Sequence, residues 1–257
     1  MNAKQNVGVE IWGLLEARMG LSVLDLQDPT CRASVLQFMD DQFEAHPNTQ
    51  AFMARLCRDD SPEAALRGRQ IIQGVFLNEV AGHGCVIQTT DATGAIVAQS
   101  WWSHETPMDI WGMLAFVWRF LTSTFYKGFK ATGWRKVPYG IKLLASSMMA
   151  VPKDEKGNEV PHLMLHNVGT APGSRKSGHA AAHMLLGVAA SEALGIPIKG
   201  CLISKRHMKP LVEVAGFVDM GPLLTPEADY PYYHWAIRWP TGNRVTIEQA
   251  KALLSIK

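Results

Sequence analysis

Cysteine is scarce in this chain, and long apolar runs and internal repeats are missing from it. The four cysteines among 257 residues lie far apart and show no Cys-x-x-Cys or Cys/His spacing, so neither a disulfide scaffold nor a zinc module is indicated. They are typical of free thiols in a reducing compartment. The N-terminus lacks a basic segment followed by a long apolar run, so no signal peptide is predicted. We therefore expect a cytoplasmic protein without a bound metal.

Charge is also limited. Charged residues make up 19% of the chain and the net charge is +2, which gives no strong field toward nucleic acid or an anionic membrane. The longest apolar run, at about 110–118, stops at Arg119, well short of the roughly 20 residues that span a bilayer. We expect neither a nucleic-acid partner nor a membrane partner. The 47% of apolar residues is enough for a full core and excludes a disordered chain.

The first hundred residues predict helices followed by a hairpin. Asp28-Pro29-Thr30 is typical of a helix start, and apolar residues then recur at helical spacing from about residue 33. A second helix is expected at about 52–57, and Ser61-Pro62-Glu63 predicts the start of another short one. The segment from 84 to 102 is β-rich on both sides of Asp91-Ala92-Thr93-Gly94, which predicts a hairpin with glycine in its turn.

The second half predicts a β-α-β unit followed by α-β. The expected elements are a strand at 162–168, a turn at 172–174, a helix at 178–194 ended by Gly195, a strand at 198–204, a short helix at 209–215 and a strand at 217–220. A strand at 232–239 and a helix at 247–254 are expected in the tail.

Between these halves lies a segment of unusual composition. Residues 110–152 hold six Lys or Arg residues, no Asp or Glu, and many aromatic residues. Three interpretations stay open: a buried helical insertion with solvated basic ends, a lid over a substrate cleft, or a surface for nucleic acid or membrane. Basic and aromatic composition alone is a weak signal for nucleic acid.

The join between the strand at 162–170 and the following helix carries the clearest chemical signal. The first N–H groups of a helix have no acceptor within it, and the helix dipole adds partial positive charge there, so anionic oxygens bind well at this place. Gly178 lets the backbone approach a ligand closely, and Arg175 and Lys176 add positive charge. The residues therefore predict a phosphate-binding loop.

Three kinds of phosphate loop can be compared with this one. Gly173 and Gly178 have the Walker A separation, but His179-Ala180 replaces the lysine and hydroxyl residue that such a loop needs. No dinucleotide fingerprint is present. The run Pro172-Gly173-Ser174-Arg175-Lys176-Ser177-Gly178-His179-Ala180, with Ala215-Gly216-Phe217 downstream, resembles motif A and the terminal Gly-Phe of the GNAT N-acetyltransferase superfamily.

The resemblance implies an α/β (α+β) fold with a mixed, mainly antiparallel central sheet flanked by helices. This sheet would splay between the strands at 162–170 and 198–204. The chain would form one domain over 1–257, with a helical insertion at about 107–155 and a coenzyme A-binding core at 160–221. The implied activity is transfer of an acetyl group from acetyl-CoA to a primary amine, which attacks the thioester directly.

The resemblance also implies the co-substrate site. The pyrophosphate of acetyl-CoA would meet the loop, its pantetheine amides would pair with the strand that precedes the loop, and the thioester would lie near Asn167 and Val168. The implied binding residues are Asn167, Val168, Gly169, Thr170, Arg175, Lys176, Ser177, Gly178, His179 and Ala180. Lys199, Lys205, Arg206 and Lys209 form a basic cluster that would either meet the 3′-phosphate of coenzyme A or stay a plain solvated surface.

Proton transfer needs a base, for which the sequence offers several candidates. We favour His166, since imidazole titrates near neutrality and this strand lies beside the expected thioester. Glu105 is the next candidate, followed by His104. His183 is expected to be structural. Val212 stands where the family often carries a tyrosine that protonates the leaving thiolate, so that acid is missing.

Several functions remain open at this point. The leading hypothesis is an N-acetyltransferase for a small amine, and the lack of acidic residues at 110–152 favours an aromatic or apolar amine over a polyamine. The alternatives are a protein or peptide N-acetyltransferase and an acyl-CoA-binding sensor without turnover. A homodimer is possible under each of them.

Overall fold

The computed structural model describes residues 22–44, 50, 61–107, 151–202, 211–213, 215–222 and 234–242. Most of the insertion expected at 107–155 lies outside these residues. So do the helices expected at 52–57 and 247–254, and Lys205, Arg206 and Lys209 of the basic cluster.

A seven-stranded sheet forms the centre of the described structure, in the order β1-β2-β3-β4-β5-β7-β6. The strands are β1 (Ser22–Val23), β2 (Gly84–Thr90), β3 (Ile96–Glu105), β4 (His162–Thr170), β5 (Ile198–Leu202), β6 (Val218–Pro222) and β7 (His234–Arg238). β4 and β5 pair in parallel, and the other neighbours are antiparallel. The expectation of a mixed, mainly antiparallel sheet is confirmed.

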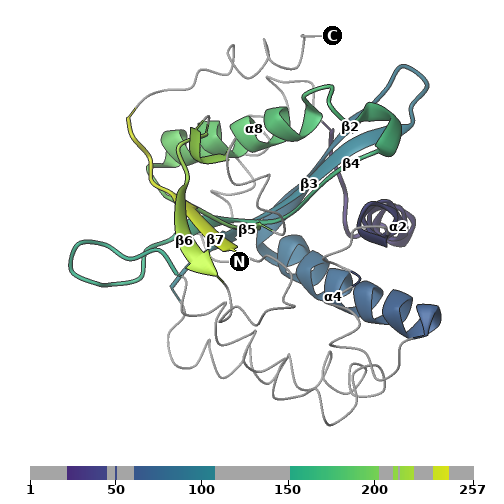
Figure 1. Ribbon diagram of the computed structural model, residues 1–257, viewed down its shortest axis with the longest axis horizontal. Helices are drawn as coiled ribbons and strands as arrows, with labels where there is room; N and C mark the ends of the chain where they lie inside the picture. Colours follow the sequence, from purple (N-terminus) through teal and green to yellow (C-terminus); the bar gives the residue numbers. More distant parts are fainter. Residues whose placement is uncertain are drawn as a thin grey trace.

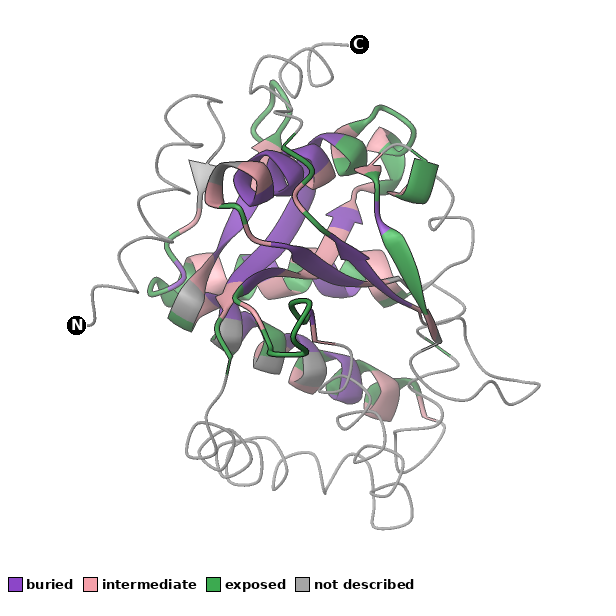
Figure 2. Ribbon diagram, turned by 90° about the vertical axis from the view of Figure 1, so that its left-hand side faces the viewer, coloured by how far each residue is buried: buried purple, intermediate pink, exposed green. Residues whose placement is uncertain are grey.

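Helices cover both faces of this sheet (Figure 1). α8 (His179–Leu194) packs on one face, around a core that includes Trp102 and Leu186. α2 (Pro29–Glu44) and α4 (Pro62–His83) pack on the other, around Val86 and Trp101. We call these the α8 face and the α4 face. The strands between them are largely buried (Figure 2), and none of the described helices is long and apolar enough to cross a bilayer.

α4 is longer than the sequence predicted. The short helix expected after Ser61 continues for 22 residues, to His83, through a stretch rich in β-branched residues that resembled the start of the β-region. The Ser61 side chain caps its first turn by accepting a hydrogen bond from the Ala64 N–H, with Pro62 in the first turn. Burial of Leu77 and Val80 against the sheet then outweighs the modest helix propensity of the β-branched residues.

The small residues of α8 set its distance from the sheet. A Cβ at Gly187 would lie 2.0 Å from the Trp102 ring, so only glycine lets the helix backbone approach the indole. Trp102 is itself fixed, since its Nε1–H donates to the Ser100 hydroxyl at 2.9 Å. The helix therefore rests directly on the aromatic core of β3.

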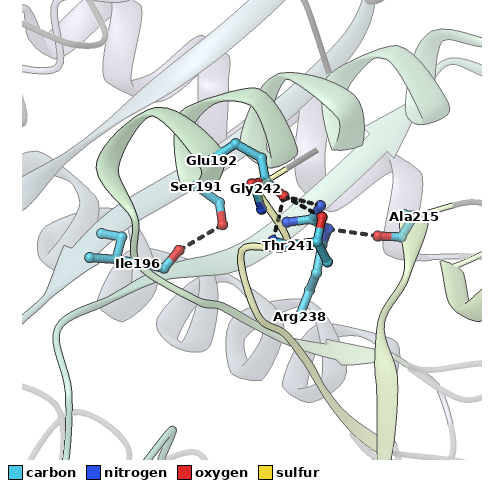
Figure 3. A network of polar contacts seen from close by, with 7 residues as sticks. All are labelled: Ser191, Glu192, Ile196, Ala215, Arg238, Thr241 and Gly242. Carbon is cyan, nitrogen blue, oxygen red and sulfur yellow. Dashed lines mark hydrogen bonds and ion pairs between the residues drawn. The ribbon is translucent and has the colours of Figure 1, made fainter. Parts of the chain in front are cut away.

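A buried ion pair ties the C-terminal end of α8 to β7 (Figure 3). Glu192 accepts hydrogen bonds from the Arg238 guanidinium and from the backbone N–H groups of Thr241 and Gly242, the latter two at 3.0 Å. Desolvation raises the pKa of Glu192, but these hydrogen bonds outweigh it and hold the pKa below its usual range. Arg238 also donates to the Ala215 carbonyl at 2.8 Å, which joins a fourth segment to the cluster.

His183 is the buried polar centre of the α8 face. Its Nε2 lies 2.9 Å from Thr89 Oγ1 and its Nδ1 lies 2.7 Å from Ser100 Oγ, so both ring nitrogens have hydroxyl partners. Burial lowers its pKa from 6.5 to about 4, and His179 adds to the effect. The expectation of a structural histidine fits this environment.

We predict that His183 makes the protein sensitive to acid. Because the pKa is about 4 in the fold and 6.5 in the unfolded chain, protonation favours unfolding below pH 6.5. The free energy of unfolding should be fully retained above about pH 7 and should fall by about 3 kcal/mol between pH 6.5 and 4. Urea unfolding at several pH values gives the free energy of unfolding of the wild type and of His183→Gln. The contribution of His183 is the difference between the two proteins in how steeply this free energy falls with pH. Parallel curves would show that His183 contributes nothing to the acid sensitivity.

Candidate active site

β4 separates from β5 partway along its length. The two strands pair only at Leu163–Leu165, opposite Ile198–Gly200, whereas β3 follows β4 to Thr170. From residue 166 onward, the edge of β4 that faces β5 has no strand on it among the described residues. The splay expected between these strands is confirmed, and it opens a length of β4 backbone to hydrogen bonding by a ligand.

A β-bulge marks the point of separation. Trp101 lies opposite Asn167 and Trp102 lies opposite Leu165, so His166 is the extra residue of β4. The bulge brings Asn167 onto the same face as His166, where its side-chain amide donates to Gln73 of α4 at 2.6 Å. α2 packs closely over the part of β4 that follows the bulge, since a Cβ at Gly169 would lie 3.0 Å from Met39 Sδ.

The loop after β4 is built to present N–H groups. Pro172–Ser174 forms a 3-10 turn, and Lys176 and Gly178 both have positive φ, 72° and 86°. The first hydrogen bond of α8 runs from the Ala182 N–H to the Gly178 carbonyl, so the N–H groups of 179–181 project from the helix start. Successive N–H groups in such a turn form a concave anion site.

This loop and the open strand fit coenzyme A. The loop is exposed, carries Arg175 and Lys176, and lies where a diphosphate would meet the helix dipole. The Thr170 hydroxyl, next to the loop, is buried and has no hydrogen-bond partner among the described residues. By register Val168 and Thr170 lie on the α8 face, opposite Ser100 and Ala98. Loop and open strand thus adjoin each other, and Arg175 Nε of the loop donates to the Thr170 carbonyl at 3.5 Å.

On the α4 face the two predicted catalytic residues come together. His166 and Glu105 belong to different strands, and the Ser103 hydroxyl lies between them. Ser103 Oγ is 2.7 Å from His166 Nε2 and donates to Glu105 Oε1 at 2.5 Å, while Nε2 and Oε1 are 3.9 Å apart. The His166 side chain is buried and that of Glu105 is 29% exposed. The ring of Phe76, from α4, lies 5.5 Å from the imidazole.

Two further basic groups lie on this face. His162 pairs with Glu105 across the sheet, and its Nδ1 lies 3.1 Å from the Val160 carbonyl. Lys199, opposite Met164 on β5, is buried with its Nζ 4.4 Å from the Trp235 ring centroid. Desolvation lowers the pKa of Lys199 to about 8, against a rise caused by Glu105, and desolvation also lowers the pKa of His162.

Some sequence expectations change here. Lys199 does not fit the surface role considered for the 3′-phosphate of coenzyme A, because its ammonium is buried on the face opposite α8. His104 lies between Ser103 and Glu105 on β3, and strand alternation directs it to the other face, away from His166. Val212 lies in a short helical stretch at 211–213 with its side chain exposed.

Ser103 is the residue that the sequence did not single out. A serine inside an apolar strand has no spacing or motif that marks it, and its alignment with His166 depends on a bulge that cannot be read from the sequence. Among the described residues, no cluster of His, Cys, Asp or Glu has an arrangement that would hold a metal ion.

Comparisons with known proteins identify the fold. No protein-family model matches the sequence, and no curated protein matches it significantly. Solved structures do match. A Corynebacterium glutamicum structure described as histone acetyltransferase HPA2 and related acetyltransferase has 19% identity and a TM-score of 0.53, covering 86% of this chain and 97% of its own.

Two insect enzymes match over similar lengths. The Drosophila melanogaster polyamine N-acetyltransferase has 14% identity and a TM-score of 0.56, covering 85% of this chain and 99% of its own. The Aedes aegypti arylalkylamine N-acetyltransferase 2 has 10% identity and a TM-score of 0.54, covering 85% and 97%. All three structures are described as acetyltransferases, and the likeness to them confirms the fold that the motif implied, a mixed sheet flanked by helices.

Proposed function

We propose that this chain, which has the GNAT fold, is an N-acetyltransferase that moves the acetyl group of acetyl-CoA to a primary amine of a small molecule. The observation that supports this best is the separation of β4 from β5 beside the N–H groups at the start of α8. The bulge at the same point of β4 directs the His166 side chain to the other face of the sheet, beside α4. A site for the acyl donor and a base for the amine therefore meet at one strand.

Each part of this site has a task in the reaction. Acetyl-CoA would supply an acyl carbon activated as a thioester. The N–H groups of about 176–180 would bind the diphosphate, and the open edge of Val168–Thr170 would hydrogen-bond the pantetheine amides. A backbone N–H near Asn167 and Val168 would polarise the carbonyl oxygen of the thioester.

The amine must be neutral before it attacks. An alkylammonium has a pKa of about 10.4, so the site must take a proton from the acceptor nitrogen. His166 accepts this proton at its ring as the nitrogen–carbon bond forms and the carbon–sulfur bond breaks. Val212 stands where the family often carries a tyrosine that protonates the leaving group, so the thiol either leaves unaided as the thiolate, whose conjugate acid titrates near pH 8.5 as cysteine does, or takes a proton from another residue.

The α4 face also bears on the class of amine. Phe76 and Trp235 supply aromatic surface around His166 and Lys199. A second ammonium on the acceptor would be repelled by the buried Lys199 cation, whereas an aromatic group would pack against the rings. These contacts favour an arylalkylamine over a polyamine.

An amine panel tests this preference. We expect thiol release from acetyl-CoA to be at least about tenfold faster in kcat/KM with an arylalkylamine than with a polyamine, the size of effect that about 1.4 kcal/mol produces. A peptide with a free N-terminus forms the third arm. Faster turnover of the peptide would support a protein acceptor instead. If no acceptor in the panel gives thiol release, the alternative of an acyl-CoA-binding sensor without turnover is supported.

Two glycines at opposite ends of α8 test co-substrate binding. Gly178 and Gly195 both have positive φ, 86° and 66°, so valine at either position should cost roughly 1–2 kcal/mol of stability. Only Gly178→Val should weaken coenzyme A binding, by about tenfold or more, because its side chain would enter the diphosphate site.

Calorimetric titration of both variants with coenzyme A measures the difference, and Gly195→Val is the matched control. Equal affinities in the two variants would exclude the loop as the binding site. Stabilisation by Mg·ATP in place of coenzyme A would point to a nucleotide enzyme.

His166 is tested separately from binding. His166→Gln should retain coenzyme A affinity within about twofold and should slow acetyl transfer by roughly 100-fold, as expected for loss of a general base. Steady-state thiol release at pH 7 and calorimetry on the same preparation give the two quantities. Unchanged turnover would show that another group takes the proton.

A further inference from the structure

The hydroxyl of Ser103, on β3, contacts both His166 and Glu105. It is fully buried, on the α4 face of the sheet, and both of its contacts are short, 2.7 Å to His166 Nε2 and 2.5 Å to Glu105 Oε1. The imidazole and the carboxylate themselves are 3.9 Å apart, beyond hydrogen-bond distance. In the described part of the chain, Ser103 therefore provides a hydrogen-bonded path between these two groups.

The direction of the two hydrogen bonds fixes the imidazole tautomer. An ionised carboxylate only accepts, so the single hydroxyl hydrogen of Ser103 points to Glu105. The Ser103 oxygen must then accept from the Nε2–H of His166. A neutral imidazole that carries its proton on Nε2 has its basic lone pair on Nδ1.

We propose that Ser103 is a positioning residue through which Glu105 orients His166 and stabilises its protonated form. This inference rests on the proposed function, in which His166 takes a proton from the acceptor amine. That proton goes to Nδ1, while the protons on Nε2 and on Ser103 Oγ stay in place. Glu105 remains ionised throughout, and its negative charge is transmitted by two hydrogen bonds rather than by proton transfer.

In many active sites a carboxylate hydrogen-bonds directly to a histidine base and orients it. Here the serine hydroxyl lies between the base and the carboxylate. Other charged groups face the same region. His162 extends from β4 and Lys199 from β5, and both lie close enough to Glu105 to interact with it electrostatically. From α4 the neighbouring ring is the uncharged Phe76.

The matched control lies on the same strand. Ser100 is also fully buried and lies 2.7 Å from a histidine, His183 Nδ1, but on the α8 face. Ser100→Ala and Ser103→Ala therefore each remove one buried serine–histidine contact from β3, together with one further contact, to Trp102 Nε1–H for Ser100 and to Glu105 for Ser103. Only Ser103→Ala should affect His166.

Histidine ¹⁵N chemical shifts of the protein without ligand test the inference directly, with His166→Gln used to assign the signal. We expect the Nε2–H tautomer in the wild type. Glu105→Gln, which retains an acceptor for Ser103 but removes the charge, should lower the pKa of His166 by about one unit, a tenfold loss of proton affinity. Ser103→Ala should lower the pKa in the same direction, Ser103→Thr should restore it, and Ser100→Ala should leave it unchanged.

Turnover gives a second readout. Since the base must be neutral, kcat/KM falls on the acid side of the pKa of His166, and this limb should move to lower pH in Glu105→Gln and Ser103→Ala. The ionisation of the amine is common to all variants and cancels in the comparison.

The two hypotheses fail in different ways. The Nδ1–H tautomer in the wild type, or a His166 pKa that is the same in wild type, Glu105→Gln and Ser103→Ala, would overturn the role of Ser103. If the pKa of His166 falls as expected in Glu105→Gln and Ser103→Ala but no amine is acetylated, the role of Ser103 between Glu105 and His166 is supported and the proposed function is rejected.

Discussion

The short ladder between β4 and β5 is the constraint on which the rest of the site depends. Three residue pairs hold the strands together, and after Leu165 the bulged His166 turns β4 away from its parallel neighbour while β3 keeps the other edge in register. One edge of backbone is thereby opened beside the start of α8. The same irregularity brings two consecutive side chains, His166 and Asn167, onto the α4 face, where regular alternation would allow one. The proposed donor site and the proposed base thus both depend on a single break in the sheet.

β3 shows how one kind of contact can serve opposite purposes. Two of its serines each contact a histidine at 2.7 Å, one on either face. His183 extends from α8 toward the sheet with hydroxyls on both ring nitrogens, and burial holds it neutral until the pH approaches 4. His166 instead lies where β4 leaves β5, with the carboxylate of Glu105 on the other side of its serine. The two histidines therefore share one kind of hydrogen bond, and the groups beyond the serine make their environments different.

Local signals in the sequence predicted much of this architecture. Gly178 and Gly195 bound α8 because both positions have positive φ, and Asp91–Gly94 turns the β2–β3 hairpin as expected. The splay followed from the family resemblance. Features that arise from long-range packing could not be predicted: the length of α4, the two-residue β1, the bulge at His166 and the bridging role of Ser103. Lys199 looked like one of several surface cations, and only the pairing of β5 with β7 brings it over Trp235.

The attachment of α8 at its far end has a consequence for recognition at its near end. Glu192 fastens the last turn to Arg238 and to the backbone of 241–242, and Gly187 seats the middle of the helix on Trp102. These two attachments restrict tilting and sliding of the helix and so hold its first turn in place. The amides there are preorganised, so an anion that binds them would lose little affinity to ordering the protein. For the proposed co-substrate, the binding free energy of the diphosphate would then be available to position the acyl group at the far end of the molecule.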